Sequence, residues 1–151
     1  MFEKIFDNNK SLIESRDANG VGLDCIFDKR NRDISCKDTT TKTYNKHSQI
    51  ITKKDAMNKT ETCVFDARGR QVSCTNRINL TVTQIFDANN NLLSVTDGQG
   101  NTTVYVYDQR NLQTERIFAD SQDAADKVVF TYDAIQRKTS QLDQKGDLIS
   151  Y

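Results

Sequence analysis

The sequence has no proline and no tryptophan, and it has a single histidine, His47. One histidine cannot supply a two-histidine metal site. His47 follows Tyr44-Asn45 in a predicted turn, where a solvated side chain is a simpler interpretation than a catalytic base. Only 36% of the residues are hydrophobic, so a deep central core is not expected. No apolar run approaches the length of a bilayer span, and membrane insertion is not expected.

An excess of charge of either sign is also missing. The 21 lysines and arginines balance 21 aspartates and glutamates, so no long-range field would attract the chain to nucleic acid or to an anionic membrane. Neither is expected as a partner. No group of converging catalytic side chains can be assembled from the sequence, so we do not expect an enzyme, a cofactor or a metal ion.

What the sequence does contain is a repeat, which begins with an aromatic residue followed by Asp or Asn. Four of the six intervals between these pairs are 21 residues, one is four residues shorter and one is four residues longer. Turns can absorb such differences in length. The repeat-defining pairs are Phe6-Asp7, Phe27-Asp28, Tyr44-Asn45, Phe65-Asp66, Phe86-Asp87, Tyr107-Asp108 and Tyr132-Asp133.

A second turn signal lies inside most units, where another Asp or Asn follows the first by ten residues. Examples of the two turns are Asp66-Ala67-Arg68-Gly69 and Asp97-Gly98-Gln99-Gly100. Asp at the first position caps a turn through its side chain, and Gly or Asn at the fourth tolerates a positive φ. The second-turn positions are Asp17, Asp38, Asp55, Asn76, Asp97 and Asp143.

Between the turns the side chains alternate, with Tyr105 and Tyr107 on one face of a predicted strand and Val104 and Val106 on the other. No stretch between turns is long enough for a stable helix, although residues 120–127 could form a helical turn or a longer loop. The pattern predicts an all-β fold of tandem β-hairpin repeats in a long, twisted sheet that could spiral. We expect a single array of about seven units over residues 1–151.

The run from Asn91 to Asp108 resembles the YD repeat of RHS proteins; it reads Asn-Leu-Leu-Ser-Val-Thr-Asp-Gly-Gln-Gly-Asn-Thr-Thr-Val-Tyr-Val-Tyr-Asp. The resemblance covers nearly the whole chain, is sharpest between Cys63 and Asp133, and is weakest between Asp38 and Lys54. This family includes bacterial RHS polymorphic toxins, the C component of insecticidal toxin complexes, and the teneurins.

The resemblance implies a structural role. In these proteins the repeats wind into a spiralling β-shell, which in the toxins encloses a C-terminal toxic domain. The implied function is a segment of a secreted or surface-displayed RHS-type protein, in a shell or a stalk. Its implied partners are neighbouring repeats of the same or identical chains, and an enclosed toxin domain or a cell-surface ligand. The proline-containing core motif that precedes the toxin is missing, so no cleavage site is carried over.

Two other functions stay open. Unpaired strand edges at both ends of the array could add identical chains head to tail and so build an extracellular fibre. The outer face of the sheet could instead serve as an adhesion module for a protein or a glycan. The aromatic residues could stack on sugars if they were exposed, but their fixed phase favours a structural ladder between neighbouring units.

The four cysteines occupy equivalent places in two units. Cys25 and Cys63 lie two residues before the aromatic, and Cys36 and Cys74 lie nine residues after it. If the first turn centres on Arg30-Asn31, and the second on the matching residues, each pair faces across a hairpin. We predict two disulfides and therefore an oxidising compartment, extracellular or at the cell surface. A bulged turn would shift the register by one residue and weaken this interpretation.

Other interpretations of these residues remain. The cysteines could be free thiols that fill inward positions. Zinc sites usually contain a Cys-x-x-Cys pair, whereas the members of each pair here are eleven residues apart. The repeated aspartates could be calcium ligands or catalytic acids, but turn capping explains them more simply.

The disulfide prediction is tested by peptide mapping of the protein without reduction. We expect linked peptides that join Cys25 to Cys36 and Cys63 to Cys74, and each link should stabilise the fold by about 2–3 kcal/mol because it closes a loop in the unfolded chain. Recovery of four unlinked cysteine peptides would contradict the prediction.

Overall fold

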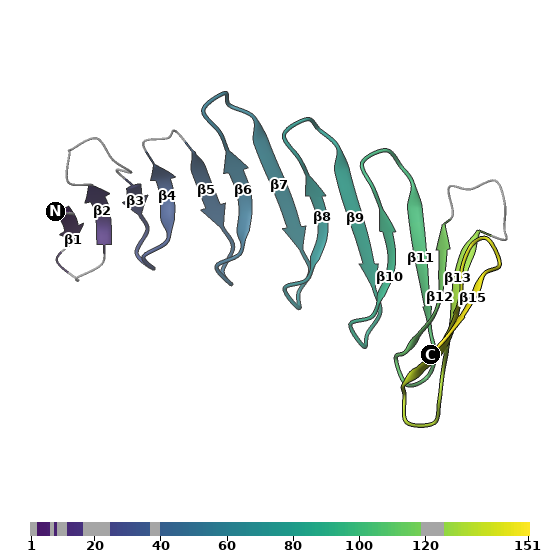
Figure 1. Cartoon of the computed structure of the whole chain (residues 1–151). Coiled ribbons are helices and arrows are strands. Elements are labelled where there is room, and N and C mark those ends of the chain that lie inside the picture. The colour runs from purple at the N-terminus through teal and green to yellow at the C-terminus, as the bar shows by residue number, and fades with distance from the viewer. Residues whose placement is uncertain (1–2, 7, 9–11, 17–24, 37–39, 119–125) are drawn as a thin grey trace. The chain divides into compact units, whose positions relative to one another are not determined.

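The computed structural model describes residues 3–6, 8, 12–16, 25–36, 40–118 and 126–151, and every regular element in these ranges is a β-strand. Figure 1 shows that successive strands within each unit run in opposite directions. Four sequence predictions lie outside the described residues. They are Asp7, the turn at 17–20, Asp38 and most of the predicted loop at 120–127.

The chain divides into two compact units, Met1–Asn79 and Leu80–Tyr151. In the first unit, each strand pairs antiparallel with the next one in the sequence. Its strands are β1 (Glu3–Phe6), β2 (Leu12–Arg16), β3 (Cys25–Phe27), β4 (Asp33–Cys36), β5 (Thr41–Tyr44), β6 (Ile50–Lys54), β7 (Thr60–Phe65) and β8 (Gln71–Thr75).

The second unit is built in the same way, and its strands also pair antiparallel in sequence order. They are β9 (Thr81–Phe86), β10 (Leu92–Thr96), β11 (Thr102–Tyr107), β12 (Gln113–Phe118), β13 (Lys127–Tyr132), β14 (Lys138–Leu142) and β15 (Leu148–Ser150). The predicted fold class, tandem β-hairpin repeats in a twisted sheet, is confirmed. The prediction that residues 1–151 form one array of seven units stays a prediction.

The two kinds of turn differ in register. In the hairpin at Asp97, the strand pairing runs without a shift from Ser94↔Val104 to Thr96↔Thr102. In the hairpins that follow an aromatic residue, the register always shifts by one residue at the aromatic. In β7 and β8, for example, Val64 pairs with Ser73 but Phe65 pairs with Gln71. Each of these hairpins therefore has a β-bulge opposite its aromatic residue.

The bulge corrects one sequence prediction. We expected two-residue turns centred on pairs such as Arg30-Asn31, and a bulge was expected to move the cysteines out of register. The observed turn is longer, because the Asp28 amide donates to the carbonyl of Arg32 and leaves residues 29–31 in the loop. The bulge at Phe27 then restores the register, and Cys25 lies opposite Cys36.

Burial is shallow, as the composition predicts. Among the described residues only Cys25 and Val128 are buried apolar side chains, at 8% and 9% exposure. Strands such as β5 and β7 instead have one half-buried face and one exposed face, whereas β4, β8, β10 and β12 are half-buried along their whole length. In β7 the half-buried face carries Glu61, Cys63 and Phe65. Stability must therefore come from contacts repeated along the sheet rather than from a central core.

The apolar residues just before Phe27, Phe65, Phe86 and Tyr107 point to the exposed face. Ile26, Val64 and Ile85 are more than half exposed, at 54%, 52% and 59%. No helix among the described residues is long and apolar enough to cross a bilayer.

Candidate functional site

The residue that begins each turn holds the turn closed with its side chain. In all ten described turns, Oδ1 of an Asp or Asn accepts the backbone N–H of the residue two positions later, at 2.8–3.0 Å. In nine of them the same oxygen also accepts the N–H four positions later. These donors would otherwise be unpaired inside a loop, so the capping residue satisfies two backbone groups at once.

The fourth residue of each turn adopts a positive φ, as predicted from the sequence. Gly69, Gly100 and Gly146 have φ values of 80°, 94° and 84°, which cost glycine little. Asparagine fills five of the other seven positions, and Ser48 and Gln136 fill the rest, at 63° and 68°. The repeat thus tolerates residues other than Gly and Asn at this position.

Turn capping also changes the acidity of the aspartates. The side chain of Arg32 is the main cause that lowers the pKa of Asp28 to about 2. Backbone N–H donors are the main cause that lowers the pKa of the other capping carboxyls for which a shift is resolved, namely Asp66, Asp97, Asp108 and Asp133. An ionised carboxylate accepts these hydrogen bonds better than a protonated one does.

Tyrosine at the aromatic position makes a contact that phenylalanine cannot make. The Tyr107 hydroxyl donates to the carbonyl of Leu92 at 3.1 Å, and Leu92 is the residue paired with Phe86. The Tyr132 hydroxyl donates in the same way to the carbonyl of Gln113 at 2.8 Å, and Gln113 is paired with Tyr107. Each tyrosine therefore reaches back to the bulge of the preceding aromatic hairpin.

Tyr44 makes the same contact although its unit is four residues shorter. Its hydroxyl donates to the carbonyl of Asp33 at 2.8 Å and to the Asp33 carboxylate at 3.0 Å. Burial, followed by the hydrogen bond to Asp33, raises the pKa of Tyr44 to about 12. Burial acts to raise the pKa of Asp33, but its bonds to Lys42 and Tyr44 outweigh burial and lower it. The change in repeat length does not disturb the tyrosine contact.

The cysteines form two cross-strand disulfides in the structure, Cys25–Cys36 and Cys63–Cys74. In each pair the Cα atoms are 4.0 Å apart, and the two residues lie directly opposite in the register. The equivalent place in the hairpin between them holds Lys42 opposite Lys53. Both disulfides lie in the first unit.

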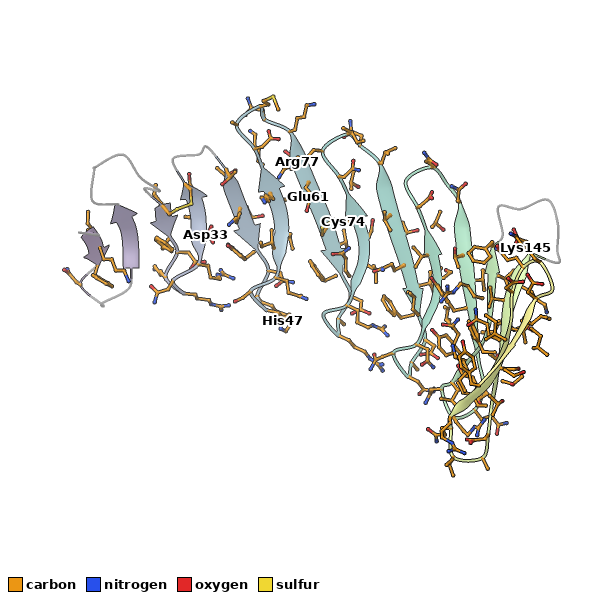
Figure 2. The ribbon with its side chains drawn as sticks, viewed as in Figure 1. Asp33, His47, Glu61, Cys74, Arg77 and Lys145 are labelled. Carbon is orange, nitrogen blue, oxygen red and sulfur yellow. A yellow bond between two sulfur atoms is a disulfide. The ribbon has the colours of Figure 1, made fainter. Side chains whose placement is uncertain are left out.

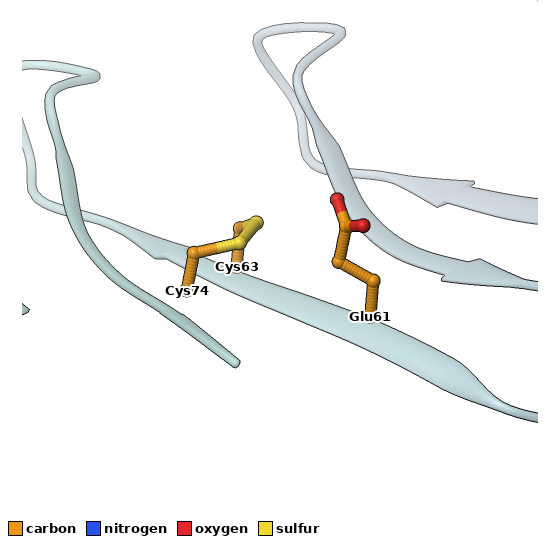
Figure 3. A group of neighbouring side chains, drawn as sticks. All are labelled: Glu61, Cys63 and Cys74. Atoms are coloured by element: carbon orange, nitrogen blue, oxygen red, sulfur yellow. A yellow bond between two sulfur atoms is a disulfide. The ribbon is translucent and has the colours of Figure 1, made fainter. Parts of the chain in front are cut away.

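Glu61 lies beside the second disulfide, as Figure 3 shows, and is two residues before Cys63 on the same strand. One potential ligand atom from each of Glu61, Cys63 and Cys74 lies within 4.8 Å of the others. In the disulfide, however, both sulfur atoms are bonded to each other and neither is a thiolate, which is the form that binds metal. The zinc interpretation of these cysteines therefore requires their prior reduction.

The structure places the predicted repeat residues along the sheet rather than around one centre. The aromatic residues of the repeat pack on the half-buried face, except Phe6, which is 52% exposed. From Phe27 onward, the Asp or Asn that follows each aromatic residue begins a turn. His47 is exposed in the turn between β5 and β6, as the sequence indicates (Figure 2).

The sequence analysis named a bulged turn only as an alternative, and it missed the tyrosine contacts. The only sequence signal for the tyrosine hydrogen bond was the presence of Tyr in place of Phe at some of the aromatic positions.

Comparison with protein families matches residues 86–122 to the RHS repeat. Comparison with curated proteins finds no match. Among solved structures, one similar chain comes from the Photorhabdus luminescens Tc holotoxin pore with a mutated TccC3, at 13% identity and a TM-score of 0.64. Another comes from the crystal structure of TcdB2-TccC3 without its hypervariable C-terminal region, at 12% identity and a TM-score of 0.57.

Both alignments cover 93% of this chain but only 9% of the other. The chain thus spans less than a tenth of the length of these structural neighbours. At such low identity the likeness shows a shared fold. Together with the match of residues 86–122, it confirms the resemblance to YD and RHS repeats.

The tyrosine contact is tested by Tyr132→Phe, which removes the hydroxyl that donates to Gln113. We expect the free energy of unfolding to fall by about 1 kcal/mol, the usual net value of one hydrogen bond. Chemical denaturation measures the change. The matched control is Tyr105→Phe, because the ring of Tyr105 contacts Arg116 but lies outside the tyrosine positions that reach a bulge. An equal loss of unfolding free energy in both variants would show that the hydrogen bond to the bulge does not stabilise the fold more than an ordinary tyrosine hydroxyl does.

The lowered pKa values of the capping carboxyls predict that acid destabilises the fold. Their pKa is lower in the folded chain than in the unfolded chain, so their contribution is present above the ordinary value of 3.8 and is lost as pH falls towards about 2. Thermal unfolding measured from pH 6 to pH 2 should show a steep loss in this window. Asp66→Asn, which keeps the Oδ1 acceptor as Asn45 does, should reduce this pH dependence. An unchanged dependence would exclude Asp66 as a contributor.

Proposed function

We propose that this chain is a non-catalytic structural segment of a larger secreted or surface-displayed RHS-type protein, in which it forms part of a β-shell or stalk. One observation carries this proposal. The residues that define the repeat are used to hold strands together: the Asp or Asn closes the turn, and the tyrosine binds the preceding bulge. Side chains that are held in these hydrogen bonds stabilise the sheet, which favours a structural role over a catalytic one.

The arrangement of the acidic groups also supports a structural role. The capping carboxyls with lowered pKa lie one to a turn. Two carboxyls that act as general acid and general base have to converge on one substrate. Hydrogen bonds to the backbone, and to the Arg32 side chain at Asp28, account for these shifts without reference to a substrate.

The comparisons support membership of a larger assembly. The similar structures are parts of Tc toxin complexes, and this chain corresponds to 9% of the compared chains. By analogy, its neighbours would be further repeats, and a toxin domain would be the enclosed partner. The two disulfides support an extracellular location, because such bonds persist in oxidising compartments.

A self-assembling fibre is the second candidate, and β15 favours it. Its residues Leu148 and Ile149 are 64% and 48% exposed, and Tyr151 beyond them is 69% exposed. A strand with exposed apolar side chains can template the addition of another strand.

The proposal is tested by electron microscopy of the purified chain together with its mass in solution over a range of concentrations. A segment of a larger wall should stay monomeric, and the native gene product that carries it should show a β-shell or stalk by cryo-electron microscopy. Ordered fibres that grow with concentration, and that are absent from an Ile149→Lys variant, would instead establish the self-assembling function. A compact native product without either feature would overturn the proposal.

A further inference from the structure

One edge of the first unit carries a concentration of positive charge. Three successive aromatic–Asp or aromatic–Asn turns there, residues 28–32, 45–49 and 66–70, contain six lysines and arginines but only two aspartates. We call these three turns the basic edge. The corresponding turns of the second unit, 87–91, 108–112 and 133–137, contain two basic and three acidic residues. The balanced charge of the whole chain hides this local excess.

The turns of the basic edge are bonded side by side. Nη1 of Arg30 donates to the carbonyl of Lys46 at 2.8 Å, which joins the first turn to the second. Nε2 of Gln49 donates to the carbonyl of Gly69 at 2.6 Å, which joins the second turn to the third. Turns on one edge are two strands apart, about 10 Å, which is close to the Debye length of about 8 Å at physiological ionic strength. At this spacing the solvent-exposed charges of neighbouring turns are largely screened from one another, so each turn presents its cations as a separate contact point.

The middle turn has no acidic residue. Asn45 begins it in place of Asp, and its Oδ1 still accepts the N–H groups of His47 at 2.9 Å and Gln49 at 3.1 Å. The turn is thus capped in the usual way without a negative charge. Figure 2 shows His47 at this edge, while Arg77 lies towards the opposite edge of the same unit.

The two aspartates of the basic edge are occupied by their own turns. Asp28 accepts Nε of Arg32 at 2.7 Å, and Asp66 accepts Nε of Arg70 at 2.7 Å. Their negative charges are therefore matched locally by the two half-buried arginines. The exposed tips of the three turns then present Lys29, Arg30, Lys46 and Arg68 to solvent.

We propose that the basic edge binds a linear polyanionic glycan through its sulfate or phosphate groups. Cations on three evenly spaced turns match charges repeated along a polymer better than they match a single small anion, because several weak ion pairs act together. This proposal goes beyond the structural role given above and does not depend on it.

The chemistry of the edge favours a glycan over a nucleic acid. Proteins that bind single-stranded nucleic acids combine a positively charged groove with aromatic side chains on which the bases stack. The three turns contain no Phe, Tyr or Trp, and their one ring is the imidazole of His47. The ring of the adjacent Tyr44 is covered by the guanidinium of Arg32, 4.4 Å from its centroid, and its hydroxyl is bonded to Asp33.

Binding is measured by calorimetry of the full chain with dextran sulfate, phosphorylated dextran and uncharged dextran of equal length. The test variant combines Lys29→Gln, Lys46→Gln and Arg68→Gln. The matched control combines Lys54→Gln, Lys59→Gln and Lys145→Gln, which remove the same charge from exposed positions elsewhere. Circular dichroism and thermal unfolding verify that both variants are folded.

We expect binding to one or both charged dextrans and none to uncharged dextran, and the affinity should fall as salt is raised. The test variant should lose at least tenfold in affinity, while the control stays within about twofold of the natural chain, since its changes lie outside the basic edge. The two charged dextrans distinguish sulfate from phosphate as the recognised group. Equal losses in both variants, or no binding to either charged dextran, would overturn the proposal. Tighter binding of DNA with the same number of charges would also overturn it, in favour of a nucleic-acid partner.

Discussion

The fold depends on one interaction, the acceptance of backbone N–H groups by the side chain at the start of each described turn, and this side chain accepts two such groups in nine of the ten turns. A sheet with almost no buried core cannot rely on hydrophobic packing to close its hairpins. The Asp or Asn oxygen closes each turn locally and leaves the strands between turns free to vary. That freedom explains why Lys, Cys, Gln and Tyr can all occupy equivalent positions two residues before an aromatic.

The sequence was sufficient to predict the turns, the strands between them and the facing cysteines, because each depends on residues close together in the chain. Gly69 and Asn111, for instance, adopt the positive φ that their position in the repeat indicates. The register was harder to predict. A turn one residue longer than expected is followed by a bulge opposite Phe27, and the two changes cancel at Cys25 and Cys36.

Two features of the candidate sites could not be predicted from single residues. The tyrosine hydroxyl meets a carbonyl 11 to 19 residues earlier, and that meeting depends on how neighbouring hairpins lie together. The basic edge arises because alternate turns come to the same side of the sheet, whereas the overall composition is neutral. Both features arise from the pairing of strands, and the average composition carries no information about that pairing.

The tyrosine contact has a direction, because each hydroxyl reaches back to an earlier hairpin and never forward to a later one in the described chain. A ribosome releases the chain from its N-terminus, so the accepting carbonyl of Leu92 emerges before Tyr107 does. Each newly made tyrosine can therefore lock a hairpin that is already complete. The three hairpins that receive this contact can therefore form in the order of their synthesis, and each is secured by a tyrosine that follows the accepting residue by only 11 to 19 positions.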